Sequence, residues 1–141
     1  MKSWKFYANY IKENPPYSGI KDKGQSKSRR KKMKKFKHKY GFEYSDIWDL
    51  DQTLTGFLLP RMAFFAEKHT GFPCNLDNLN ENGEIKNRDK LANEYQEKLN
   101  TIVEGLYLYY SRELYQMNKE EQELWEKAKQ YLVEVWSGLW D

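Results

Sequence analysis

Three stretches of this sequence repeat their apolar residues at steps of three and four, the spacing of one face of an α-helix. They cover about residues 46–70, 88–117 and 119–138, and polar segments or turn residues separate them. No stretch shows the sustained alternation of apolar and polar residues, bounded by hairpin turns, that predicts a β-strand. The sequence therefore predicts an all-α protein whose body, residues 40–141, is a three-helix bundle.

Local signals refine two of these helices. Asn118 and Glu121 have the spacing of a capping box, which predicts the start of the third helix. Pro60 lies inside the first helix and removes the hydrogen bond to the carbonyl of Gly56. A kink is therefore expected between Gly56 and Pro60.

The apolar stripe of each helix is expected to face the core. In the first helix the inward residues are Ile47, Leu50, Leu54, Phe57, Leu58, Arg61 and Phe65. In the second they are Leu91, Tyr95, Leu99, Ile102, Leu106, Tyr110 and Met117. In the third they are Leu124, Trp125, Ala128, Leu132, Val135, Trp136 and Leu139.

Arg61 is the exception in the first stripe. Its stem can pack while its head extends into water, or it can pair with an acid such as Glu104. A functional alternative is a clamp on a phosphate or carboxylate, because the guanidinium is planar and always charged. Asp51 lies on the flank of the same helix, where we expect a partner such as a tryptophan N–H or an arginine.

The N-terminal 40 residues differ sharply in charge from the rest. They hold 14 Lys and Arg against Glu13 and Asp22, a net of +12, whereas the remaining residues carry a net of −9. The spacing of Trp4, Tyr7 and Ile11 predicts a short helix over residues 3–13. We interpret residues 14–39 as a linker or a conditionally ordered helix. Residues 1–39 are thus predicted to be a basic, partly disordered arm.

Several classes of protein are disfavoured. The single cysteine, Cys74, cannot form an intramolecular disulfide, which favours a reducing compartment and predicts a cytoplasmic protein. The sequence contains no apolar run of about 18 residues, so no membrane span is predicted. His38 and His69 lack the spacing of metal ligands, and no catalytic signature or cofactor motif is present. An enzyme is therefore the least supported class.

The basic arm itself indicates a nucleic-acid partner. Its densest cations are Arg29, Arg30, Lys31, Lys32, Lys34 and Lys35. Neutralising several phosphates in this way gives binding that depends strongly on salt and little on sequence. The signal has low specificity, because basic tails also serve solubility or contact anionic membrane surfaces.

From Tyr40 onward the sequence resembles a family of small proteins of tailed bacteriophages. The resemblance rests on GFEYSDIWDLDQTLTGFLLPRMAFF, on EYQEKLNTIVEGLYLYY and on the closing LVEVWSGLWD, and the basic arm lies outside it. The family positions present in this chain are Trp48, Leu50, Asp51, Pro60, Arg61, Gly105, Trp140 and Asp141. Tyr95 and Leu106 stand where the family often has tryptophan and phenylalanine.

The resemblance implies a phage accessory protein that acts stoichiometrically in counter-defence in the host cytoplasm. It would sequester a host immune cyclic nucleotide in a pocket between helices or protomers, as a homo-oligomer. Arg61 would contact phosphate, Trp48, Tyr110 or Trp136 would stack on bases, and Asp51 would complete the ligand-binding set. A body with a net charge of −9 opposes such an anion. The alternatives are a nucleic-acid-binding accessory protein with a dimeric bundle, or a protein decoy that blocks a host defence enzyme.

Overall fold

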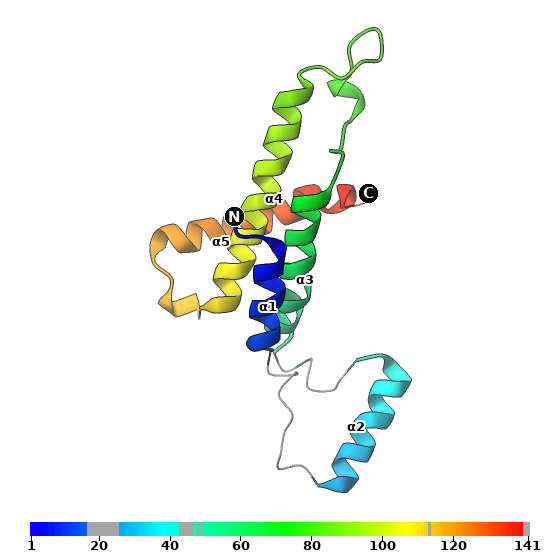
Figure 1. Ribbon diagram of the computed structural model, residues 1–141, viewed down its shortest axis with the longest axis vertical. Helices are drawn as coiled ribbons and strands as arrows, with labels where there is room; N and C mark the ends of the chain where they lie inside the picture. Colours follow the sequence, from blue (N-terminus) through cyan, green and yellow to red (C-terminus); the bar gives the residue numbers. More distant parts are fainter. Residues whose placement is uncertain (17–25, 43–46, 48, 113, 140–141) are drawn as a thin grey trace.

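The computed structural model describes residues 1–16, 26–42, 47, 49–112 and 114–139, and within these ranges the protein is all-α, as predicted (Figure 1). Its α-helices are α1 (Trp4–Glu13), α2 (Lys27–Tyr40), α3 (Leu50–Lys68), α4 (Arg88–Ser111) and α5 (Lys119–Val135). Three short 3-10 turns follow α3, α4 and α5: η3 (Leu76–Asn78), η4 (Leu114–Gln116) and η5 (Trp136–Gly138).

Helix α4 is the centre of the body. It packs against α3, and α5 crosses it, while α1 lies along α3 (Figure 1). The core is formed mainly by α3 and α4, and its largest fully buried side chains are Leu59, Leu99, Ile102 and Val103. The body is therefore a helical bundle of the three predicted helices with α1 added.

The crossing of α4 and α5 is close because two small residues meet there. A Cβ placed on Gly105 would lie 2.2 Å from the Cβ of Ala128. The absence of a side chain at Gly105 therefore lets the two helix backbones approach. Further along, Tyr95 of α4 donates a hydrogen bond to the carbonyl of Gly138 at 3.1 Å, which attaches the C-terminal turn.

The predicted helix at 3–13 is confirmed as α1, but it belongs to the body. Tyr7 is buried, and its ring lies edge-on to Tyr107 of α4 at 5.4 Å. The backbone N–H of Trp4 donates to the carboxylate of Glu67 at the end of α3. The segment that stands apart from the body therefore begins after α1, which differs from an arm that spans residues 1–39.

The predicted linker 14–39 contains a second helix, α2. The side chain of Ser26 caps it by accepting a hydrogen bond from the N–H of Arg29, and Gly41 ends it with a φ of +80°. Helix α2 stands apart from the other helices (Figure 1). Most of the remainder of the predicted linker, residues 17–25, lies outside the described residues.

The helix ends agree with the sequence in part. The capping box of Asn118 and Glu121 is confirmed at the start of α5, with both of its hydrogen bonds present. Helix α3 begins at Leu50, and the expected first turn at residues 46–48 lies mostly outside the described residues. Helix α4 ends at Ser111, six residues before the predicted end, because the chain turns into η4. Helix α3 continues through Pro60.

The predicted inward face of α4 is confirmed, because Tyr95, Leu99, Ile102 and Leu106 are buried. The predicted face of α3 is mostly wrong, although two of its residues, Leu58 and Phe65, are partly buried and pack against the core. Its buried residues are Thr55, Gly56, Leu59, Met62, Ala63 and Ala66. Leu50, Leu54 and Phe57 are each about half exposed, because α4 and α1 pack against the opposite side, where small residues permit close contact. Trp136, also expected inside, is 61% exposed.

Candidate functional site

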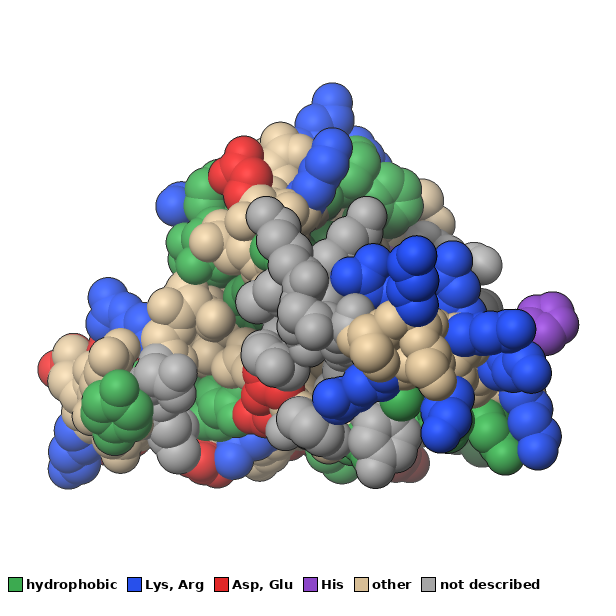
Figure 2. All heavy atoms as spheres, turned by 90° about the horizontal axis from the view of Figure 1, so that it is seen from below, with side chains coloured by type: hydrophobic (Ala, Val, Ile, Leu, Met, Phe, Trp, Pro, Cys, Tyr) green, Lys and Arg blue, Asp and Glu red, His purple; other side chains and the backbone are tan. Residues whose placement is uncertain are grey.

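The most highly charged surface of the described residues is α2. Nine of its 14 residues are Lys or Arg, none is acidic, and every one of these cations is exposed. Viewed from below, they gather on one part of the molecule (Figure 2). Met33, Phe36 and Tyr40 share one face at helical spacing, so the cations cover the remaining faces. Helix α2 is therefore a basic rod with a narrow apolar strip.

Local interactions hold α2 together against the repulsion of its own charges. Like charges three and four residues apart disfavour a helix. Phe36 packs against Tyr40 and Phe42, with ring centroids 4.7 Å and 5.3 Å apart, and this cluster secures the C-terminal end. Lys37 and Lys39 lie in the last turn, where the helix dipole favours positive charge. A polyanion bound to α2 would remove most of the remaining repulsion.

All six cations predicted to contact nucleic acid lie on this helix. Arg29, Arg30, Lys31, Lys32, Lys34 and Lys35 are exposed along it. Lys27, Lys37 and Lys39 extend the same surface and were not singled out from the sequence. The run of cations on both sides of the six was the available signal.

Two adjacent tyrosines near the end of α4 hold the two ends of the segment that carries α2. The hydroxyl of Tyr110 donates to the carbonyl of Asn14, just after α1, at 2.6 Å. The hydroxyl of Tyr109 donates to the carboxylate of Asp51, in the first turn of α3, at 2.5 Å. Residues 15–50 therefore leave and re-enter the body at neighbouring points. We call the two contacts, Tyr110 with Asn14 and Tyr109 with Asp51, the tyrosine clamp.

The electrostatics of the clamp follow from these contacts. The hydrogen bond from Tyr109 lowers the pKa of Asp51, because it stabilises the carboxylate. Burial raises the pKa of Tyr110 to about 12, and Tyr10 and Asp49 contribute in the same direction. At neutral pH the clamp therefore holds the ionised carboxylate of Asp51 and the protonated hydroxyl of Tyr110.

Both clamp rings are fixed by packing. The ring of Tyr109 stacks on Trp125 of α5, with centroids 4.3 Å apart and planes 14° from parallel. The ring of Tyr110 lies over Gly56 of α3, where an added Cβ would come within 2.9 Å of it. The partner of Asp51 is thus a tyrosine hydroxyl, in place of the tryptophan N–H or arginine that the sequence indicated.

A polar hollow of about 470 Å³ opens beside the clamp. Two carboxylates, Asp49 and Asp51, line it together with Tyr109 and Tyr110. Among the described residues that line it, Arg112 is the one Lys or Arg, and it pairs with Glu121. The hollow therefore has an acidic character that opposes anionic ligands.

The structure brings together two of the five residues predicted to bind a cyclic nucleotide. Asp51 and Tyr110 both line the hollow, whereas Arg61 and Trp136 do not. Trp136 lies in η5 at the C-terminal end of α5. Trp48 lies outside the described residues.

Arg61 interacts with its own helix. Its guanidinium lies 3.7 Å above the ring of Phe57, and Nη1 donates to the carbonyl of Phe57 at 2.8 Å. The suggested acid partner, Glu104, lies 3.6 Å from the amino group of Met1. Arg61 is exposed, in agreement with the alternative in which its head extends into water.

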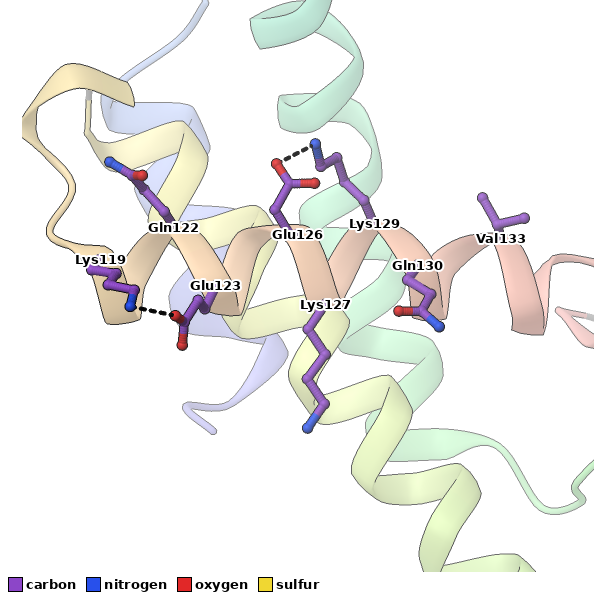
Figure 3. A pocket seen from close by; sticks show the side chains of 8 residues that line it. All are labelled: Lys119, Gln122, Glu123, Glu126, Lys127, Lys129, Gln130 and Val133. Atoms are coloured by element: carbon purple, nitrogen blue, oxygen red, sulfur yellow. Dashed lines mark hydrogen bonds and ion pairs between the residues drawn. The ribbon is translucent and has the colours of Figure 1, made fainter.

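A shallow depression of about 850 Å³ follows the outer face of α5. Its lining comes from α5 alone, and the side chains in Figure 3 spread outward from the helix. Lys119 pairs with Glu123 and Lys129 with Glu126. Because charges of both signs alternate and pair along the helix, nothing converges on a common point, and we assign no site to this face.

The described residues hold no group of three or more His, Cys, Asp and Glu arranged to bind a metal ion. Among the helices of the described part of the chain, none combines the length and apolar character of a membrane span. Comparison of the chain with protein-family models, curated proteins and solved structures gives no match. The resemblance to phage proteins therefore stays a prediction.

Proposed function

We propose that this protein binds nucleic acid through α2, with little dependence on base sequence. The observation that supports the proposal is a helix with nine exposed cations and no acid, held apart from a body of opposite net charge. Phosphate contacts by Lys and Arg carry most sequence-independent affinity. Base-specific contacts are not required for this activity.

The size of α2 suits a duplex. Its 14 residues extend for about 21 Å, and the major groove, about 12 Å wide, admits an α-helix. If about five or six of the cations reach phosphates, the slope of log K against log salt is about −5. Affinity should then fall about a thousandfold between 50 and 200 mM salt.

The charge distribution also predicts coupled ordering. Lys27, Lys31 and Lys34 share the face opposite Met33 and Phe36, and their mutual repulsion opposes helix formation. Binding of a polyanion neutralises them, so the helical content of the protein should rise on titration with a duplex. Circular dichroism at low salt measures this change.

The direct test is fluorescence anisotropy with a labelled duplex of random sequence over a range of salt concentrations. Replacing Lys27, Lys31 and Lys34 by Gln removes three cations from one face of α2. The salt slope should become shallower by about 2.7, that is about 0.9 for each lost phosphate contact.

A matched control removes the same charge from the body. Lys90, Lys119 and Lys127 are exposed on α4 and α5, and the triple Gln variant has the same net charge as the α2 variant. It should retain the original salt slope. Equal losses in the two variants would show that net charge, and not α2, governs binding, and would end the proposal.

Sequestration of a cyclic nucleotide by a phage counter-defence protein is the second candidate, supported by the resemblance and by the meeting of Asp51 and Tyr110 at one hollow. Its geometry is less favourable, because Arg61 lies elsewhere and Asp49 adds negative charge. Calorimetry against cyclic di- and trinucleotides tests it, and absence of heat for all of them would reject it.

A protein decoy is the third candidate. Exposed apolar side chains such as Trp136, which is 61% exposed, and Val133, which is 77% exposed, could contact a host enzyme. A pull-down from host lysate that recovers one defence enzyme, and loses it when both residues are replaced by Gln, is the expected result for this function.

A further inference from the structure

The outer face of α3 carries an exposed apolar seam. Leu50, Leu54, Phe57 and Phe64 are 49%, 50%, 55% and 47% exposed, and Arg61 completes a regular spacing of four and three residues. This is the spacing of the contact positions of a coiled coil. The face is therefore patterned as a helix–helix contact.

Helix α3 is apolar on the opposite face as well. Leu59, Met62 and Ala63 are buried against the body on that side. A helix with apolar residues all round is normally covered on every side. Ile47, which is 50% exposed, extends the apolar surface beyond the start of the helix. Within the described residues, α1 covers this surface only at one end, where the ring of Trp4 lies edge-on to Phe64 at 5.2 Å.

We propose that the seam packs against the same seam of a second copy of the chain, antiparallel, about a two-fold axis near Phe57. Asp49 and Asp51 lie at the N-terminal end of α3, whereas its C-terminal half holds Arg61 and an ion pair of Lys68 with Glu67, which leaves a net positive charge there. An antiparallel pair brings each acidic end to a basic end and opposes the two helix dipoles, whereas a parallel pair brings like charges together.

Arg61 has a defined place in this dimer. It makes no ion pair within the described residues, although its stem lies in the seam. With Leu50 opposite Phe64 of the second copy, Arg61 lies opposite Leu54 and beside the partner's acidic end. A guanidinium that is flanked by an aromatic ring and faces a carboxylate favours this one register. A uniformly apolar seam would allow several registers of the two helices.

Helix α2 is the other described element with an apolar strip, and its charge disfavours it as the cover. Packing α2 on the seam would bring nine cations toward Arg61 and Lys68. Phe36 and Tyr40 already pack with Phe42. A second copy of α3 presents no such excess of positive charge.

The contact is modest in size. The 19 residues of α3 extend for about 28 Å, so a single helix pair lies at the lower end of specific interfaces. A reversible dimer with a dissociation constant of about 1 to 100 µM is the expected strength.

Sedimentation equilibrium over a range of concentrations measures the dimer. Replacing Leu54 and Phe57 by Gln should weaken it at least tenfold. The matched control replaces Leu76 and Val133, 84% and 77% exposed outside α3, by Gln and should leave the dimer unchanged. Circular dichroism verifies that both variants fold. A wild-type protein that stays monomeric, or a control as weak as the seam variant, overturns the proposal.

Cysteine cross-linking tests the orientation, in a chain with Cys74 replaced by Ser. Phe57→Cys lies near the axis and should form a disulfide-linked dimer on oxidation. Copies of residue 50 lie about 21 Å apart along the helices, beyond the roughly 7 Å between Cα atoms that a disulfide spans. Leu50→Cys alone should therefore stay monomeric, and a mixture with Phe64→Cys should cross-link. Equal cross-linking of Phe57→Cys alone, of Leu50→Cys alone and of the mixture with Phe64→Cys overturns the antiparallel arrangement.

The dimer does not rest on nucleic-acid binding. The cross-linking and sedimentation measurements use the protein alone, and the substitutions lie outside α2. If the protein proves monomeric, the salt-slope experiment still tests nucleic-acid binding. If nucleic-acid binding is rejected, the dimer measurements are unaffected.

Discussion

Substitution of Gly105 by Ala tests the close crossing of α4 and α5. The new Cβ would lie 2.2 Å from that of Ala128, whereas carbon atoms in ordinary contact are about 3.5 to 4.0 Å apart. The helices must separate by about 1.5 Å or distort, and such overpacking costs about 1 to 3 kcal/mol. In an open helix the same change stabilises by about 1 kcal/mol. Subtracting the propensity gain from the overpacking cost, we expect a net loss of about 1 kcal/mol in the free energy of unfolding, with an upper end of about 2 kcal/mol, opposite in sign to the propensity effect.

Urea unfolding of a double-mutant cycle gives the magnitude. Ala128→Gly alone should destabilise, yet it should restore part of the loss when combined with Gly105→Ala, with a coupling of about 1 to 2 kcal/mol. Gly71→Ala is the control, because nothing lies within 4 Å of its added Cβ, and it should change stability by less than about 0.5 kcal/mol. A Gly105→Ala protein as stable as the wild type would refute the packing argument.

Three further predictions concern the clamp and the helix cap. Because the pKa of Tyr110 is raised from 10.0 to about 12, its stabilising contribution is present below pH 10 and is lost as pH rises toward 12. The loss in the free energy of unfolding is at most about 2 to 3 kcal/mol. Tyr110→Phe should flatten this alkaline profile in urea unfolding. The pKa of Asp51 is lowered, so its contribution is present above its ordinary pKa of 3.8 and is lost as pH falls through the folded value; Tyr109→Phe should reduce this acid sensitivity. Asn118→Ala removes the box with Glu121 and should cost about 1 kcal/mol in thermal unfolding.

The faces of α3 show why periodicity identified the helix but chose the wrong side. Leu50, Leu54 and Phe57 fit one apolar stripe, and Leu59 and Met62 fit another on the opposite side. The first stripe has larger apolar side chains, so it was the stronger indication of a core-facing side. The core formed on the second stripe, where small side chains allow close packing, and no rule of spacing expresses that preference.

The clamp was beyond sequence reasoning for a different reason. The sequence indicates that Asp51 has a partner, but Tyr109 is 58 residues away in the chain, and only the tertiary packing of α3 against α4 brings the two together. The box of Asn118 and Glu121 was predictable because its partners are three residues apart. Polar contacts between residues close in the chain can be predicted from a single sequence, whereas long-range polar contacts cannot.

The proposed dimer and the proposed nucleic-acid contact have a common geometric consequence. Helix α2 ends at Tyr40 and α3 begins at Leu50, so in an antiparallel α3 pair the two α2 helices lie toward opposite ends of a contact about 28 Å long. One turn of duplex DNA measures about 34 Å, so one duplex can reach both basic helices. Affinity should then rise steeply once a duplex exceeds about one to two turns, because the second contact is intramolecular. The Leu54→Gln, Phe57→Gln variant should lose this dependence on duplex length and keep its affinity for the shortest duplex. A variant that retains the full length dependence would separate nucleic-acid binding from the α3 seam.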